Sequence, residues 1–221
     1  MKSVEWPGVL LARKSFNPEY VAARDRLADV AKRGDWPAMF AILDGAIESF
    51  TPGANDWRVG GASWYSPLHQ VAWLGAPTDV AQGLVDRGAW RTLREASGHS
   101  PLDLATSRGH DHLREVLAPT FSQPIGADDL AAMSERLAEL VNSAAREVVD
   151  EGTNIRHLDV TGIAGSGASV WFPIPGMYGG FAVELYRNRL HVESWSRVIG
   201  GSGRAYVITP TRTTLVDEGF V

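Results

Sequence analysis

Four polar side chains in one short stretch near the end of the chain have the chemistry that acid–base catalysis requires. They are Glu184, His191, Glu193 and Arg197, which together offer carboxylates, an imidazole and a guanidinium. Glu184, His191 and Glu193 nevertheless alternate with apolar residues, as on the solvent-facing side of a β-strand. We therefore expect solvated cross-strand pairs at these positions, with a catalytic or binding cluster as the alternative. In that alternative, a small-molecule pocket would be formed by Met177, Tyr178, Glu184, His191, Trp195 and Arg197.

Other groups of reactive residues match no familiar catalytic or metal-binding motif. His110-Asp111-His112 is the densest set of metal-ligand types, but side chains two residues apart on a helix do not face one another. The glycine-rich stretches 162–167 and 200–203 resemble phosphate-binding loops, which require a preceding strand and a following helix. Strands are expected on both sides instead, so flexible connections are favoured. The sequence therefore predicts no metal and no cofactor, and it favours a protein that is not an enzyme.

The composition is that of a folded globular protein without a nucleic-acid partner. The chain has 221 residues, of which 44% are hydrophobic and 21% charged, so one large or two small domains can form. Lys and Arg number 21 against 26 Asp and Glu, and the net charge of −5 gives no basic excess for binding phosphate backbones. No segment has the pattern of a targeting signal or a membrane span, so we expect a cytoplasmic location and no membrane partner. The absence of cysteine excludes disulfides and thiolate chemistry.

Two segments of the first half repeat the same pattern. Each begins with Ser-Pro-Leu, and the two prolines, Pro67 and Pro101, are 34 positions apart. Serine before proline is a favoured helix start, because the hydroxyl accepts a hydrogen bond and the first helical position needs no N–H. Gly75 and Gly109 occupy equivalent positions, where a left-handed residue would end the helix. The pattern predicts two copies of one helical unit.

The repeated segments resemble ankyrin repeats, whose first helix starts with Ser/Thr-Pro-Leu-His, as residues 66–69 do, and whose usual period is about 33. A weaker helix–glycine–helix copy lies at residues 21–45, and a long aromatic connection at residues 46–65 follows it. The resemblance therefore implies an ankyrin-repeat domain over residues 1–120, with a degenerate first repeat and an inserted loop.

Ankyrin repeats bind partner proteins through their loop tips and the concave face of their first helices. By resemblance, the contact positions fall on Ala62, Ser63, Tyr65, Trp73 and Leu74 in one repeat, and on Ala96, Ser97, His99, Ser107 and Arg108 in the next. The residues expected to bind a partner are Trp57, Tyr65, Trp73, Leu74, His99, Ser107 and Arg108. Packing of Trp64, Tyr65 and Trp73 against the long loop or the C-terminal domain is the alternative.

Residues 121–221 are predicted to form a small α+β domain. An apolar stripe at helical spacing predicts one long helix over residues 127–151. About five short strands follow, starting at residues 155–160, and tight turns between consecutive strands predict an antiparallel sheet covered by the helix. Residues 173–181 (Pro-Ile-Pro-Gly-Met-Tyr-Gly-Gly-Phe) and 194–203 resemble segments of bacterial ankyrin-repeat proteins that carry such a domain. The expected fold is α+β: an all-α ankyrin solenoid of about three repeats, then a long helix packed on a small antiparallel sheet.

These observations favour a non-enzymatic protein-interaction module. It would bind an unidentified protein through the concave ankyrin face and the aromatic loop. An immunity or antitoxin-like protein, which neutralises its partner, is a specific form of this hypothesis that rests on analogy. The alternative is a small-molecule enzyme or sensor with its pocket in the C-terminal domain.

Overall fold

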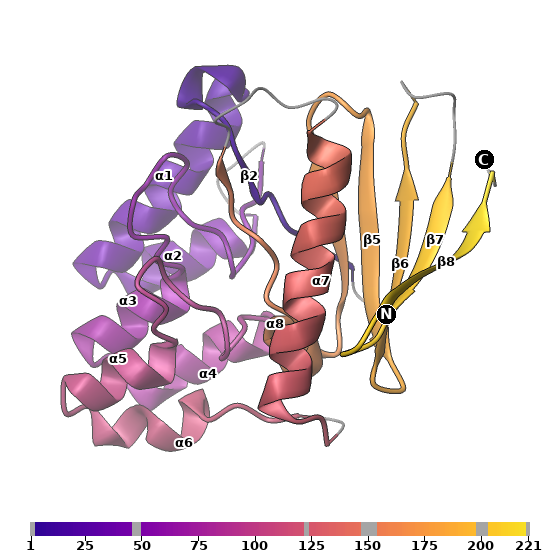
Figure 1. The fold of residues 1–221 in the computed structure, drawn as a ribbon. Helices are drawn as coiled ribbons and strands as arrows, with labels where there is room; N and C mark the ends of the chain where they lie inside the picture. The colour runs from indigo at the N-terminus through magenta and orange to yellow at the C-terminus, as the bar shows by residue number, and fades with distance from the viewer. Residues whose placement is uncertain (1–2, 46–49, 122–123, 147–153, 198–202, 220–221) are drawn as a thin grey trace. The chain divides into compact units, whose positions relative to one another are not determined.

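The computed structural model describes residues 3–45, 50–121, 124–146, 154–197 and 203–219. In these residues the chain is α+β, with eight α-helices and a mixed six-stranded sheet. Its contacts divide into two compact units, Leu11–Thr120 and a second unit composed of Met1–Leu10 and Phe121–Val221. We call them the helical unit and the sheet unit (Figure 1).

The helical unit contains six of the described α-helices. They are α1 (Pro18–Arg33), α2 (Trp36–Leu43), α3 (Pro67–Leu74), α4 (Thr78–Asp86), α5 (Pro101–Ser107) and α6 (Arg114–Leu117), with 3-10 turns at Arg13–Ser15 and Asp111–Leu113. The helices α3 and α5 begin at Pro67 and Pro101, as the repeated pattern predicts. The weaker copy at residues 21–45 also forms two helices separated by a glycine, Gly34.

Local capping explains where these helices begin and end. The carboxylate of Asp103 accepts a hydrogen bond of 2.9 Å from the Ser100 backbone N–H, and the Ser100 hydroxyl accepts one of 3.2 Å from the Asp103 backbone N–H. This reciprocal pair satisfies backbone donors that the first turn of α5 leaves open. Gly75 follows α3 with φ +64°, a left-handed conformation that glycine adopts without steric cost.

Helices from successive segments pack on one another in the helical unit. The helix α3 contacts α1, α4 and α5, and α4 contacts α6. Figure 1 shows α1, α3 and α5 following one another down the stack. Leu68, Val71, Leu84, Leu113 and Leu117 have no exposed surface and lie in one hydrophobic cluster. Each helix pair therefore buries its apolar side against the next pair.

The sheet unit combines eight described strands and two helices. They are β1 (Ser3–Glu5), β2 (Val9–Leu10), α7 (Ala127–Ala145), β3 (Asn154–Ile155), α8 (Val160–Ser166), β4 (Ser169–Ile174), β5 (Gly179–Tyr186), β6 (Arg189–Trp195), β7 (Arg204–Ile208) and β8 (Thr213–Glu218). Six strands form a sheet in the order β1-β4-β5-β6-β7-β8, and β2 pairs with β3. The pairing from β4 to β8 is antiparallel, as predicted, but β1 is parallel to β4.

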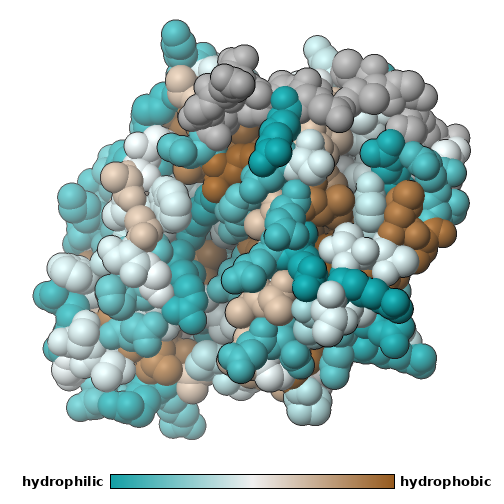
Figure 2. Space-filling view, in the orientation of Figure 1, coloured by the Kyte–Doolittle hydropathy of each residue, from teal (hydrophilic) through white to brown (hydrophobic). Residues whose placement is uncertain are grey.

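One face of the sheet carries the apolar core of this unit. Val170, Val183 and Val192 are register partners on β4, β5 and β6, and all three are buried. The helix α7 contacts α8 and β7, and α8 contacts β5. Figure 1 shows α7 running alongside the strands of the sheet. In Figure 2, hydrophilic side chains predominate along the outward side of α7, as amphipathic periodicity requires.

Three expectations that concern the sheet unit differ from the structure. Residues 1–10 belong with the sheet rather than with residues 11–120, because β1 pairs with β4. The strand expected at residues 155–160 is confined to β3. The glycine-rich stretch 162–167 lies in α8 and its C-cap rather than in a connection between strands, because the Asp159 carboxylate caps the helix by accepting a 2.8 Å hydrogen bond from the Thr161 N–H.

Two other expectations extend outside the described residues. The predicted helix at 127–151 is described as α7 up to Ala145, and residues 147–153 are not described. Most of the glycine-rich stretch 200–203 also falls outside the description. Among the described helices, none combines the length and the apolar character that crossing a membrane requires.

Candidate functional site

A groove with a volume of about 820 Å³ is the main candidate site of the helical unit. Its lining residues come from α1, the segment before α3, α3 itself and the turn before α5: Ala28, Asp29, Lys32, Arg58, Gly61, Ala62, Ser63, Trp64, Tyr65, Gln70, Trp73, Leu74, Glu95, Ala96 and Ser97. We refer to it as the groove.

The exposed side of α3 supplies the apolar part of the groove. Leu68, Val71 and Ala72 follow one another at helical spacing and are completely buried. The opposite side of the helix therefore faces the groove, and it carries Trp73 and Leu74, which are 40% and 43% exposed. Large apolar side chains with this exposure are available to a ligand or partner.

An aromatic and cationic cluster surrounds Trp73. The rings of Tyr65 and Trp73 meet edge to face with centroids 6.1 Å apart, and the guanidinium carbon of Arg108 lies 3.9 Å from the Trp73 ring centroid. His69 lies behind Tyr65, with ring centroids 5.5 Å apart, and is completely buried. Burial raises the pKa of Tyr65, and the nearby Glu95 carboxylate adds to the shift. The phenol is therefore held neutral within the cluster.

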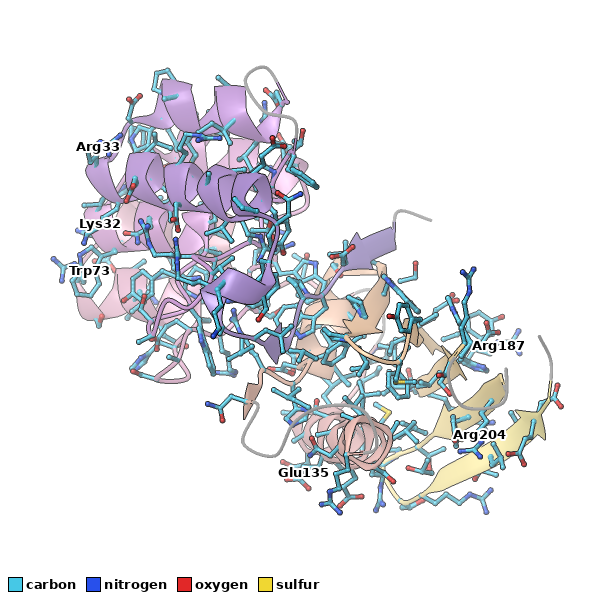
Figure 3. All side chains as sticks on the ribbon, turned by 90° about the horizontal axis from the view of Figure 1, so that it is seen from above. Lys32, Arg33, Trp73, Glu135, Arg187 and Arg204 are labelled. Carbon is cyan, nitrogen blue, oxygen red and sulfur yellow. The ribbon has the colours of Figure 1, made fainter. Side chains whose placement is uncertain are left out.

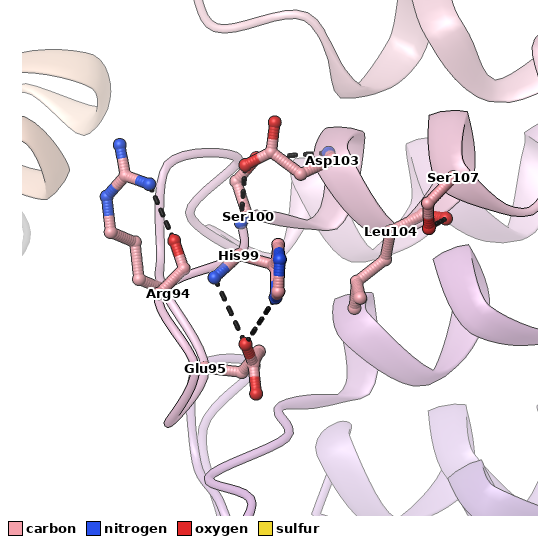
Figure 4. A network of polar contacts seen from close by, with 8 residues as sticks. Arg94, Glu95, His99, Ser100, Asp103, Leu104 and Ser107 are labelled. Carbon is pink, nitrogen blue, oxygen red and sulfur yellow. Dashed lines mark hydrogen bonds and ion pairs between the residues drawn. The ribbon is translucent and has the colours of Figure 1, made fainter.

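The turn before α5 is held by Glu95. Its carboxylate accepts hydrogen bonds from the His99 backbone N–H at 3.1 Å and lies 2.9 Å from the His99 Nδ1 (Figure 4). Burial acts to raise the pKa of Glu95, but hydrogen bonds from the backbone of Ser97 and His99 outweigh it and lower the pKa. The Ala96 N–H donates to the Ser63 carbonyl oxygen at 3.1 Å, which joins the two segments that line the groove.

The long connection between α2 and α3 is tied to α1 by charge pairs. Arg24 is buried against the Asp56 carboxylate, with Nε and Oδ2 3.0 Å apart. Its guanidinium lies 4.7 Å from the Tyr20 ring centroid and 5.6 Å from that of Trp57. Arg58 forms ion pairs with Asp25 and Asp29 on the next turn of α1. These contacts fix the position of the groove wall.

The structure places the predicted partner-binding residues unequally. Tyr65, Trp73 and Leu74 line the groove, and Arg108 reaches it through its contact with Trp73. His99 is exposed on the turn that Glu95 holds, and the exposed Ser107 donates a 2.9 Å hydrogen bond to the Leu104 carbonyl oxygen. Trp57, a predicted partner-binding residue, is only 3% exposed. The neighbouring Asp56 binds the buried Arg24 of α1, and the Arg24 guanidinium lies beside the Trp57 ring.

Lys32, Arg58 and Glu95 line the groove but were not among the predicted site residues. A repeat alignment carries a signal for Lys32, which precedes Gly34 by two residues as Trp73 precedes Gly75. Nothing comparable marks Arg58 or Glu95, since their positions depend on partners elsewhere in the fold.

The pocket residues predicted in the sheet unit do not come together as one cluster. A cavity of about 170 Å³ lies between α7 and the sheet, and of the predicted residues Met177 and Trp195 line it. Glu184 and His191 are register partners on β5 and β6, as expected for cross-strand pairs, and they do not line this cavity. Tyr178, which is 76% exposed, and Arg197 also lie outside its lining.

The histidines around residue 110 contact backbone groups. His110 Nδ1 lies 2.9 Å from the Ala72 carbonyl oxygen, and His112 Nε2 lies 3.0 Å from that of Ala76. Both contacts tie one helix pair to the preceding one. Within the described part of the chain, no group of three or more His, Asp or Glu side chains is placed to hold a metal ion.

A scan against models of protein families finds no match to the chain, and a search of the curated proteins finds no similar sequence.

Proposed function

We propose that the protein is a non-enzymatic interaction module, in which residues 18–117 are a short stack of ankyrin repeats and the groove is the binding site for a partner protein. The observation that carries the proposal is the exposed Trp73, which Arg108 and Tyr65 hold in the groove. An immunity or antitoxin-like role, in which binding neutralises the partner, is a specific form of this proposal.

Three features of the helical unit support the assignment to ankyrin repeats. The two Ser-Pro-Leu helix starts are 34 positions apart, and each helix has a capping box at its N-terminus. Gly75 has the left-handed conformation that ends the first helix of a pair. His110 bonds the backbone of the preceding pair. Such contacts define the scaffold and leave the side chains at the helix ends free for binding.

The chemistry of the groove supports a protein partner. Trp, Tyr and Arg are the residue types that contribute most often to the energy of protein interfaces, and all three meet at Trp73. The ion pairs of Arg58 and the hydrogen bonds of Glu95 connect the groove walls to neighbouring segments of the helical unit, and a wall ordered in this way would lose less entropy on association. An aromatic patch on a rigid, capped helix stack is an arrangement that proteins use for recognition.

Affinity purification with a matched pair of variants tests the proposal. The full chain, Trp73→Ala and Trp195→Ala are used as baits in the cell from which the sequence comes. Trp195 is the control, because it is 38% exposed and lies in the sheet unit, whereas Trp73 is 40% exposed. We expect the full chain and Trp195→Ala to co-purify one protein in a stoichiometric amount. For the purified partner, the dissociation constant should be about 30-fold higher with Trp73→Ala.

Unchanged affinity of the purified partner for a folded Trp73→Ala variant would overturn the proposal. The cavity of the sheet unit is smaller than the roughly 300–1,000 Å³ that small-molecule sites occupy, so we propose no second function there.

A further inference from the structure

Three cations near Trp73 have no carboxylate partner in the part of the chain that the structure describes. Lys32 lines the groove, Arg33 follows it at the end of α1, and Arg108 covers the Trp73 ring. Figure 3 shows Lys32, Arg33 and Trp73 on the same side of the helical unit. Among the described residues, no carboxylate lies within the 4.0 Å ion-pair distance of these three cations.

The acidic residues of the groove have partners other than these three cations. Asp29 pairs with Arg58, and the Glu95 carboxylate accepts hydrogen bonds from His99. Hydrogen bonds from the backbone of Ser97 and His99 contribute to keeping Glu95 ionised and occupied. When Arg33 and Arg108 are counted with the lining residues, four cations (Lys32, Arg33, Arg58 and Arg108) stand against two carboxylates (Asp29 and Glu95). This surface therefore has an excess of positive charge, although the chain as a whole has a net charge of −5.

Helix dipoles account for part of this arrangement. Lys32 and Arg33 lie in the last turn of α1, and Arg108 directly follows α5, so each cation is near a helix C-terminus. A C-terminus carries about half a negative charge, whereas Lys32 and Arg33 together carry two whole positive charges. The dipole favours these positions but leaves most of the positive charge available to a partner.

The repeat geometry arranges the charges around an apolar centre. Lys32 and Arg33 occupy the two positions before Gly34, and Trp73 and Leu74 occupy the two positions before Gly75. Because α3 contacts both α1 and α5, the surface runs from cations on α1, across apolar side chains on α3, to Arg108 at the end of α5.

We propose that the groove recognises an acidic segment of a protein partner, in which carboxylates flank one apolar anchor residue. This inference rests on the proposed function and specifies the partner. The anchor packs on Trp73 and Leu74, and the carboxylates bind Lys32 and Arg33 on one side and Arg108 on the other. Packed helices lie about 8–10 Å apart, which an extended peptide spans in about three residues. The spacing sets the distance between the anchor and the acidic residues that bind α1.

Synthetic peptides of about nine residues test the inference. One peptide has glutamates at both ends, a central phenylalanine, and glycine or serine between them. Two matched peptides replace the glutamates by lysine or by glutamine. Binding to the full chain is measured by titration calorimetry, and the indole N–H signal of Trp73, assigned with Trp73→Phe, reports whether the groove is occupied.

We expect the acidic peptide to bind at least about tenfold more tightly than the lysine peptide, to shift the Trp73 signal, and to weaken as salt is added. Lys32→Glu should weaken the acidic peptide by about fivefold or more and strengthen the lysine peptide. Lys14→Glu is the matched control, because Lys14 is exposed in the 3-10 turn at Arg13–Ser15 and is not among the groove residues. The Lys14→Glu variant should bind the acidic peptide with the same affinity as the unmodified chain.

Equal or tighter binding of the lysine or glutamine peptide, with the Trp73 signal shifted, would overturn the acidic preference and leave the proposed function standing. No binding of the acidic peptide up to about 1 mM would also overturn the inference. The proposed function itself is tested separately, by the affinity of the purified cellular partner for Trp73→Ala.

Discussion

The Arg108 guanidinium covers one face of the Trp73 ring, with 3.9 Å between the guanidinium carbon and the ring centroid. The two residues come from the ends of different helices, Trp73 from α3 and Arg108 from the residue after α5. Their contact therefore links two successive helix pairs at the surface. It also holds the exposed indole beside the guanidinium, so a partner of the proposed kind would meet a site that is already ordered.

A double-mutant cycle on this pair should reveal a direct coupling. We expect Arg108→Ala and Trp73→Ala to be non-additive by about 0.5–1 kcal/mol in the free energy of unfolding, the usual range for an exposed cation–π contact. Denaturant unfolding of the two single variants and the double variant measures it. Arg114, which pairs with Asp111, serves as the control: Arg114→Ala combined with Trp73→Ala should be additive. Additivity of the Arg108 pair would contradict a direct contact.

The Arg24–Asp56 pair should contribute strongly to the stability of the helical unit. Their side chains are 6% and 14% exposed, so Arg24→Ala leaves a carboxylate in a poorly solvated site and removes a cation from between Tyr20 and Trp57. We expect a loss of about 3 kcal/mol in the free energy of unfolding.

The comparison for Arg24 is the Arg114–Asp111 pair, whose side chains are 61% and 75% exposed. Solvent screens such a pair, so Arg114→Ala should cost less than about 1 kcal/mol. Equal costs in chemical denaturation would show that burial of Arg24 does not determine its contribution.

Local signals explain what could be predicted from the sequence. The starts of α3 and α5 follow from Ser-Pro-Leu because a cap needs only neighbouring residues. Alternation in β5 and β6 likewise placed Glu184 and His191 opposite the apolar set, and they are register partners. The contact positions around Trp73 came from the repeat resemblance, and Tyr65, Trp73 and Leu74 do line one groove.

The missed features depend on residues that are distant in sequence. Trp57 lies in a segment rich in turn signals, but its burial depends on Asp56 meeting Arg24 on α1. Trp6 lies in a short segment with no strong periodicity, and its indole N–H donates to the Arg156 carbonyl oxygen across 150 positions of the chain. The helix α8 is not predicted from the sequence because its glycines disfavour a helix locally. In the folded protein, burial of Ile163 favours the helix.

Trp6 should be essential for the stability of the sheet unit. Its side chain is 2% exposed, its indole N–H donates to Arg156 at 2.8 Å, and the preceding residues form β1 beside β4. Trp6→Ala should therefore lower the free energy of unfolding by about 3–5 kcal/mol and increase hydrogen exchange in β4. Trp195→Ala, at an exposed site of the same unit, provides the comparison. A Trp6 variant with unchanged exchange in β4 would exclude this role for the N-terminal segment.

His157 should make the stability of the sheet unit depend on pH. The residue is half-buried between β3 and α8, and burial lowers the pKa of its imidazole. Its Nδ1 has no hydrogen-bond partner among the described residues. Above about pH 7.5 the imidazole is neutral in both the folded and the unfolded chain, so it contributes no pH dependence. As the pH falls below that value, the unfolded chain takes up the proton first, and the free energy of unfolding decreases until the folded imidazole is protonated as well.

Replacing His157 by glutamine isolates this contribution from the other histidines. The difference in unfolding free energy between the unmodified chain and His157→Gln should be constant above about pH 7.5 and should shift in favour of the variant on acidification, by at most about 1.4 kcal/mol per pH unit. Denaturant unfolding at a series of pH values measures this difference. A difference that stays constant through the acidic range would mean that the folded protein accepts the proton at His157 as readily as the unfolded chain does, and a shift in favour of the unmodified chain would mean that it accepts the proton more readily; either result contradicts the prediction.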